Sequence, residues 1–206
     1  MARPTVVSLL VLALAAAVAA SARPSPAGVS AGPVVAIVGV NVVPMDRERT
    51  LANHTVLVRD GRIAEVGPAD RVSVPEGATR IDGRGKWLIP GLAEMHAHIP
   101  PGNATVADME RMLELNLLNG IVVVRGMLGD PRHLALRERA ARGELASPLI
   151  LTSGPSFNGN SAPTPEAAVK MVADQKAAGY DLLKIHPGVP RAAFDAMGAA
   201  AGRVGL

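Results

Sequence analysis

The sequence predicts an α/β protein in two parts, a small β domain followed by repeating strand–helix units. Residues 34–89 read as short β-branched runs broken by turn signals, among them Asp60-Gly61, a dipeptide typical of tight hairpins. From Leu88 onward, short apolar runs alternate with segments of helical periodicity, which is typical of a parallel sheet with covering helices. With 206 residues, the chain is long enough for one or two domains.

Strand and helix signals locate the expected elements. In the first part, β-branched runs predict strands at residues 34–43, 55–59, 62–66 and 79–82. In the second part, apolar runs predict strands at residues 92–98, 121–125, 148–152 and 181–186. Helical spacing, with Thr164 as a cap and prolines at helix starts, predicts helices at residues 105–119, 131–142, 164–178 and 190–203.

The N-terminus has the features of a secretory signal peptide. Residues 6–20 form an apolar run after a basic residue, and an A-x-A cleavage site ends at Ala22. The run is shorter than the ~20 residues of a spanning helix, so we expect cleavage and no stable membrane anchor. We therefore predict a signal peptide at residues 1–22, a disordered Pro/Gly/Ser-rich leader at residues 23–32, and a periplasmic or secreted protein.

The composition excludes several classes of protein. The formal net charge is +3, and no Lys/Arg cluster has interleaved aromatic residues, so we expect no nucleic-acid partner. The chain has no cysteine, which excludes disulfides, thiolate zinc sites, a cysteine nucleophile and a lipid anchor on cysteine. Aliphatic side chains and methionine must form the core, because aromatic residues are only 2% of the chain.

Two histidines at the end of the first apolar strand form a candidate metal site. If residues 92–98 are a strand, His96 and His98 face one way, whereas Met95 and Ala97 face the other way into packing. Histidine is the commonest metal ligand near neutral pH, and a hydrolytic site needs two or three further ligands and an open position. Since a pair with this spacing also arises by chance, the motif alone does not decide between a metal site and two surface histidines.

The surrounding residues resemble a known family. The run PGLAEMHAHI is similar to the first barrel strand of the amidohydrolase superfamily, usually PGLIDxHxH, with Glu94 where that family has Asp. The run VLVRDGRIAEVGP resembles the small β-sandwich that precedes the barrel in many members. The resemblance implies a small β-sandwich domain at residues 33–89. It also implies that residues 90–206 are the N-terminal half of a metal-dependent hydrolase barrel, a partial TIM (β/α)8 barrel.

About four βα units are visible where a closed barrel needs eight. Such a half-barrel would expose two parallel edges and an apolar face. We expect an N-terminal fragment of a longer protein, cut just before a fifth strand. The alternative is a natural half-barrel that completes itself as a homo-oligomer.

Lys184 is the third candidate ligand. It lies near the end of the fourth expected strand, and barrel enzymes place their chemistry at the carboxyl ends of strands. A lysine between two apolar residues is unusual, and a neutral amine can react with carbon dioxide to give a carbamate that bridges two cations. The run GYDLLKIHPGV resembles strand four of imidazolonepropionase-like and Xaa-Pro dipeptidase-like members, some of which use a carboxylated lysine there. The alternative is a lysine whose ammonium group extends into solvent.

Other polar residues are weaker candidates. Arg125 ends the second strand, where it could bind a substrate carboxylate or pair with an acidic residue. His186 faces the same side as Lys184 and could line the site or belong to the following loop. The Gly/Asn/Ser loop at residues 154–163 and the strand before it contribute three further pocket candidates, Asn158, Asn160 and Ser153. We expect the two remaining histidines to be solvated, His54 and His133.

The resemblance implies an exported hydrolase that cleaves amide, peptide or cyclic amide C–N bonds with hydroxide on one or two divalent metals, with zinc the expected ion. His96 and His98 would hold the first metal, and carboxylated Lys184 would bridge to the second. The family's remaining histidine ligands and its proton-shuttle Asp are expected beyond Leu206, so little turnover is expected from this chain alone.

The expected partner is a small-molecule or peptide substrate. Two rival interpretations are a non-catalytic half-barrel that serves in binding or assembly, and a lyase or deaminase on the same scaffold.

Overall fold

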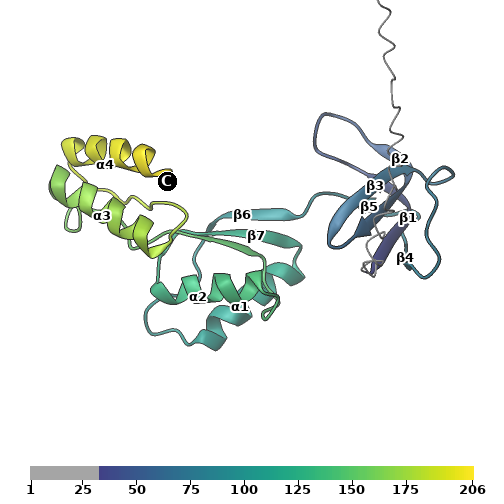
Figure 1. Ribbon diagram of the computed structural model, residues 1–206, viewed down its shortest axis with the longest axis horizontal. Helices are drawn as coiled ribbons and strands as arrows, with labels where there is room; N and C mark the ends of the chain where they lie inside the picture. The colour runs from purple at the N-terminus through teal and green to yellow at the C-terminus, as the bar shows by residue number, and fades with distance from the viewer. Residues whose placement is uncertain (1–32) are drawn as a thin grey trace, which may run out of the picture. The chain divides into compact units, whose positions relative to one another are not determined.

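The computed structural model describes residues 33–206, which form two compact units (Figure 1). The first unit contains the described residues up to Val43 and Glu48–Leu88, and the second contains Pro44–Arg47 and Ile89–Leu206. The signal peptide and the leader predicted for residues 1–32 lie outside the described part. Among the described residues, no helix is long and apolar enough to cross a membrane.

The first unit is a five-stranded sheet with the order β3-β2-β1-β4, in which β5 also pairs with β1. β1 runs antiparallel to β2 and parallel to β4 and β5. At the tip of the β2–β3 hairpin, Asp60 and Gly61 both have positive φ, 51° and 72°, as the Asp-Gly signal predicts. The strands are β1 (Val34–Val42), β2 (Leu51–Arg59), β3 (Arg62–Pro68), β4 (Thr79–Asp82) and β5 (Trp87–Leu88).

The four strands expected in this unit are present, and β5 is an addition of two residues. The facing sheets of a β-sandwich are not confirmed, because the described strands of this unit belong to one sheet. Two small apolar clusters, centred on Ala36 with Leu57 and on Val40 with Val56, cover parts of the sheet. Between them the register of β1 shifts at Gly39, where φ is 74°.

The second unit holds a three-stranded parallel sheet with the order β6-β7-β8, and helices follow its strands. The mixed α/β class predicted from the sequence is therefore confirmed for this unit. The strands are β6 (Leu92–Ala97), β7 (Ile121–Gly126) and β8 (Leu149–Thr152). The helices are α1 (Val106–Leu118), α2 (Pro131–Ala141), α3 (Pro165–Ala178) and α4 (Arg191–Val204).

The fourth strand expected in this unit, residues 181–186, does not form as a continuous strand. Two isolated parallel bridges take its place, Ser153 with Leu182 and Phe157 with Ile185. Pro155 lies between the bridged residues and has no backbone N–H to donate to a ladder. The segment therefore follows β8 in the expected direction, but a partial barrel of four regular strands is not confirmed.

Local sequence signals fix the helix ends. Thr105 caps α1 in a reciprocal capping box with Asp108, and the Thr164 side chain caps α3 ahead of Pro165. Pro190 differs slightly from expectation, because it is the cap residue of α4 and not the first residue inside it.

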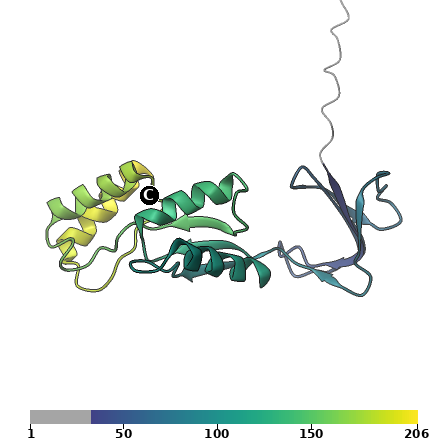
Figure 2. The same ribbon diagram turned by 90° about the horizontal axis from the view of Figure 1, so that it is seen from below.

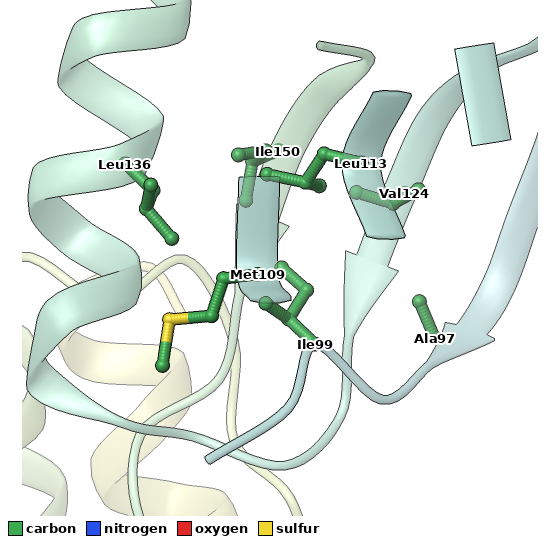
Figure 3. Close-up of a cluster of buried hydrophobic side chains, with 7 residues drawn as sticks. All are labelled: Ala97, Ile99, Met109, Leu113, Val124, Leu136 and Ile150. Atoms are coloured by element: carbon green, nitrogen blue, oxygen red, sulfur yellow. The ribbon is translucent and has the colours of Figure 1, made fainter. Parts of the chain in front are cut away.

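Helices α1 and α2 pack on the parallel sheet through one apolar cluster, which Figure 3 shows. Every strand of this sheet contributes to the cluster, which comprises Ala97, Ile99, Met109, Leu113, Val124, Leu136 and Ile150. Met95 is not in it, contrary to the predicted alternation, and its side chain is 53% exposed. The reason is that β6 is an edge strand whose register shifts between Glu94 and Ala97.

Helices α3 and α4 pack side by side (Figures 1 and 2) over a second apolar cluster. Phe157 lies fully buried in it, and Leu183 packs against its edge. The irregular pairing that replaces the fourth strand joins the segment of Phe157 to the segment of Leu183, and this cluster anchors both.

We predict that truncation of the α1 side chains in the first cluster destabilises the chain. Met109→Ala and Leu113→Ala each remove a fully buried side chain, so each should lower the free energy of unfolding by about 2–5 kcal/mol. Urea denaturation followed by circular dichroism measures this loss. The matched control is Leu118→Ala in the same helix, where a 74% exposed side chain should change stability by less than about 0.5 kcal/mol. Equal losses for buried and exposed positions would contradict the packing described.

Candidate metal centre

The end of β6 presents the two histidines of the candidate metal site. His96 and His98 are exposed, while Ala97 between them is buried against the helices. The two rings therefore share one side of the strand end, with their centroids 5.2 Å apart. The burial of Ala97 and Ile99 in the core anchors the strand end that carries both rings.

Lys184 reaches this pair from a distant part of the sequence. Its Nζ atom lies 3.1 Å from Nε2 of His96. The Phe157 backbone N–H donates to the Lys184 carbonyl at 2.8 Å, which fixes the segment that carries the lysine. The amine thus contacts an imidazole instead of extending into solvent.

The pKa of His96 lies below its ordinary value. The largest cause is the positive charge of Lys184, followed by desolvation and the nearby His98 and Arg125, while Glu94 acts in the opposite sense. A lowered pKa keeps the imidazole neutral near pH 7, and the neutral ring is the form that binds metals.

The donors present match part of a metal site. Two imidazole rings suit zinc and similar divalent ions, whereas an ammonium group has no lone pair with which to bind a metal. Within the described residues, no three His, Cys, Asp or Glu side chains are placed to hold a metal ion. The described site therefore consists of two candidate histidine ligands next to a lysine.

Arg125 makes a contact that the sequence analysis did not predict. Its Nε atom donates a hydrogen bond to the backbone carbonyl of Met95 at 2.8 Å, across from β7 to β6. Beside it, the Glu94 carboxylate accepts a hydrogen bond from the backbone N–H of His96, also at 2.8 Å. Both side chains thus bind the backbone that carries the first histidine.

The remaining pocket candidates have structural contacts of their own. The Asn158 side-chain oxygen accepts hydrogen bonds from the backbone N–H groups of Asn160 and Ser161, at 2.9 and 3.0 Å, and so caps its own loop. The His186 ring is exposed, and its backbone N–H donates to Phe157. Ser153 is fully buried and its hydroxyl has no hydrogen-bond partner, so it does not line an open pocket.

The expectation that His133 is solvated was wrong. His133 is fully buried in α2, and neither ring nitrogen makes a hydrogen bond of good geometry within the protein. Burial lowers the pKa of its imidazole, although the Pro100 carbonyl and Asp130 oppose the effect. The sequence held a signal, because His133 stands three residues before the buried Leu136 and shares its helix face. His54, in contrast, is half-buried on β2 and bonds to the nearby Ala52 carbonyl.

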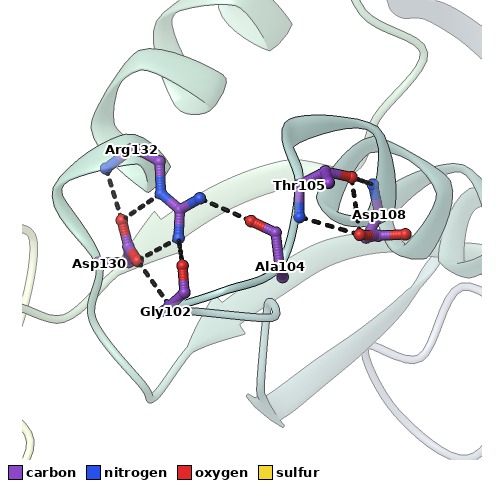
Figure 4. Close-up of polar contacts among 6 residues, drawn as sticks. All are labelled: Gly102, Ala104, Thr105, Asp108, Asp130 and Arg132. Atoms are coloured by element: carbon purple, nitrogen blue, oxygen red, sulfur yellow. Dashed lines mark hydrogen bonds and ion pairs between the residues drawn. The ribbon is translucent and has the colours of Figure 1, made fainter.

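A partly buried ion pair between Arg132 and Asp130 ties the loop after β6 to the start of α2 (Figure 4). The Asp130 carboxylate accepts hydrogen bonds from the Arg132 backbone and guanidinium and from the Gly102 N–H. The same guanidinium donates to the carbonyls of Gly102 and Ala104, each at 2.7 Å. The loop that follows His98 is thereby held in place, and Arg132 keeps the pKa of Asp130 well below its usual range.

The chain is similar in sequence and in structure to several known proteins. Over 46 residues the chain is 44% identical to a dihydroorotase of Anaeromyxobacter sp. (strain K), covering 22% of this chain and 10% of that protein. Over 77 residues it is 32% identical to an imidazolonepropionase of Stenotrophomonas maltophilia (strain R551-3), covering 36% of this chain and 19% of that protein. A crystal structure described as a prolidase from Bifidobacterium longum superposes on 85% of the chain with a TM-score of 0.76 and 27% identity.

These relatives are all members of one superfamily. By these similarities the chain resembles members of the amidohydrolase superfamily. No single protein-family model matches the chain. The chain spans 48% of the prolidase structure and a smaller share of the curated relatives.

We predict that Asp130→Asn lowers stability at neutral pH by about 1.5–3 kcal/mol, because it removes the charge from a buried, multiply hydrogen-bonded carboxylate. Since the folded-state pKa of Asp130 is lowered, its contribution is complete above the ordinary Asp value of about 3.9 and declines as the pH falls below it. Urea denaturation at a series of pH values from 7 downward should therefore show that the free energies of unfolding of the wild type and Asp130→Asn converge below about pH 4. Asp174→Asn, at an exposed pair with Lys170, is the control and should cost less than about 1 kcal/mol. A difference in the free energy of unfolding between the wild type and Asp130→Asn that stays constant at all pH values would contradict this prediction.

A second prediction concerns His133. Its folded-state pKa is lowered, so below the ordinary value of about 6.5 the unfolded chain takes up a proton that the folded chain does not. The wild type should therefore lose stability from pH 7 to pH 5, and His133→Leu should lose less over the same interval. Thermal denaturation at several pH values tests this, with the half-buried His54→Leu as the control. An identical pH dependence for His133→Leu and wild type would show that His133 is not buried in its neutral form.

Proposed function

We propose that His96, His98 and Lys184 form part of a divalent-metal site for the hydrolysis of amide, peptide or cyclic amide C–N bonds. The observation that carries this proposal is the 3.1 Å approach of the Lys184 Nζ atom to His96 Nε2, beside the His98 ring. Residues 88 positions apart meet at the end of a parallel sheet, where barrel enzymes place their chemistry.

The relatives support the reaction class. Dihydroorotase, imidazolonepropionase and prolidase are hydrolases that act on C–N bonds, and the superfamily typically depends on divalent metals. The activity and substrate of the whole protein remain proposals, because the chain spans about half of the prolidase structure. The proposal assigns the proton-shuttle role to no residue of this chain.

The two histidines would serve as the metal ligands of the proposed site. A bound metal would polarise the substrate carbonyl and lower the pKa of a bound water. His96 and His98 offer neutral ring nitrogens as ligands, and the lowered pKa of His96 favours this form. Zinc is the proposed ion, because imidazole and carboxylate groups are among its usual ligands.

Lys184 would join the site as a carbamate. The neutral Nζ atom forms a bond to the carbon of carbon dioxide and releases one proton to solvent, which leaves a carboxylate on a long arm. Such a group can contact two cations at once, whereas the ammonium form repels them. Lys184 is partly buried between two apolar neighbours, Leu183 and Ile185, beside the two histidines.

We also propose that the protein is exported, on the basis of the apolar run and A-x-A site of its first 22 residues. Expression in a bacterial host followed by N-terminal sequencing of the periplasmic fraction tests this. A mature chain that begins at Arg23 is the expected result, and an uncleaved protein confined to the cytoplasm would contradict it.

The metal proposal predicts that His96→Ala and His98→Ala each lower zinc affinity by more than about tenfold, since even residues that only support metal ligands contribute that much. Titration with a chromophoric zinc chelator measures the affinity of the purified chain. His54→Ala, in the other unit, is the control and should bind zinc as the wild type does. Equal affinities for all four proteins, or no zinc binding by the wild type, would overturn the proposal.

Carboxylation of Lys184 has its own test. The chain incubated with zinc and carbon-13-labelled bicarbonate should give a carbamate carbon resonance that is absent from Lys184→Ala. Lys170→Ala removes an exposed lysine and serves as the control. A resonance that persists in Lys184→Ala would assign the carbamate to another amine.

A further inference from the structure

The pairing of β6 with β7 contains two irregularities that compensate for each other. The first pair is Leu92 with Ile121 and the last is Ala97 with Gly126, so both strands advance by the same number of residues. Between these pairs, however, Glu94 is opposite Val124, which is one residue out of step with both ends. β7 therefore has one extra residue near its start, and β6 has one extra residue between Glu94 and Ala97.

The extra residue of β6 lies where the strand presents its first histidine. β-bulges of this kind bend a strand and turn a side chain away from strict alternation. The exposure of Met95, which strict alternation would bury, is one sign of this turn. The other is the His96 ring, whose Nε2 atom meets the Lys184 amine.

Two side chains bind the backbone at this bulge. The His96 N–H donates to the Glu94 carboxylate, and the Met95 carbonyl accepts from Nε of Arg125, both at 2.8 Å. These two hydrogen bonds give the His96 N–H and the Met95 carbonyl partners at the bulge, and they thereby favour the bulged form. One contact acts along β6 and the other links β6 to β7, so together they fix both the shape and the position of the bulge.

We propose that Glu94 and Arg125 are positioning residues, which hold the β6 bulge and thereby aim the His96 ring at Lys184 and the metal. Neither needs to touch the substrate or the metal to do this. The proposal rests on the proposed metal site for its functional consequence, whereas the bulge and its two contacts are independent of any metal.

The first experiment needs no metal. Hydrogen exchange of the His96 backbone amide, followed by NMR, should be at least about tenfold faster in Glu94→Ala than in the wild type. Glu94→Gln keeps an acceptor oxygen at the same position and should retain most of the protection. Glu144→Ala is the matched control, because that carboxylate pairs with Arg142 at an exposed site outside β6. Unchanged protection of the His96 amide in Glu94→Ala would overturn the proposal.

The second experiment measures zinc affinity by chelator competition. Glu94→Ala and Arg125→Ala should each bind zinc about 10–100-fold more weakly, as expected for groups that orient a ligand. Added ethylguanidinium should partly restore the affinity of Arg125→Ala, and Glu94→Gln should stay near wild type. Arg142→Ala is the control for loss of a guanidinium elsewhere. Circular dichroism checks that each variant is folded, and Arg125→Lys replaces Arg125→Ala if the latter is not.

The two experiments separate the two proposals. If the wild type binds no zinc, the metal proposal fails, and the exchange rate of the His96 amide still decides whether Glu94 holds the bulge. If His96→Ala loses zinc while folded Glu94→Ala and Arg125→Ala bind it as the wild type does, the metal site stands and the positioning role is wrong. A purely structural role would lower thermal stability without changing the zinc affinity of the folded protein or giving rescue by ethylguanidinium.

Discussion

Parallel pairing is the constraint on which the second unit depends. Because parallel strands need crossovers, the chain returns through α1 and α2 on the same face of the sheet, where one apolar cluster buries them. The carboxyl ends of the strands then lie along one edge. His96 and His98 stand at that edge on β6, and Lys184 reaches it from the segment that follows β8. The meeting of these residues is thus a consequence of chain direction, which no local signal at any of them contains.

Polar contacts concentrate at this same edge, because the regular ladder ends there. Loops that leave a parallel sheet carry backbone groups without ladder partners, and each must find another. Asp130 and Arg132 supply hydrogen-bond partners for the loop after β6. Glu94 and Arg125 supply partners for the bulge within β6 itself. Side chains that look like candidates for substrate binding in the sequence are therefore in part occupied with holding the backbone. Asn158 illustrates the same point in the loop after β8.

The sequence predicts what is decided locally. Helix starts at Thr105 and Thr164 follow from capping, and the β2–β3 hairpin follows from Asp60-Gly61, because each depends on neighbouring residues. The errors occur where distant contacts decide. Pro155 interrupts the fourth strand from the partner side of the pairing, and the bulge that exposes Met95 depends on β7. Likewise, β5 has only two residues and exists through its pairing with β1. The motif PGLAEMHAHI located the first two candidate ligands, but the contact with Lys184 required the fold.

Lys184 and a metal ion would compete for the same atom. When the ammonium group donates to His96 Nε2, it occupies the single lone pair of that nitrogen, which a metal bound there would need. The positive charge of Lys184 also lowers the pKa of His96, which favours the neutral form of its ring. The neutral form of an amine reacts with carbon dioxide to give a carbamate, so in the proposed site Lys184 would bind as a carboxylate and not as an ammonium group. Lys184 thus favours the neutral form of His96, and as a carbamate it would itself be a ligand of the proposed site.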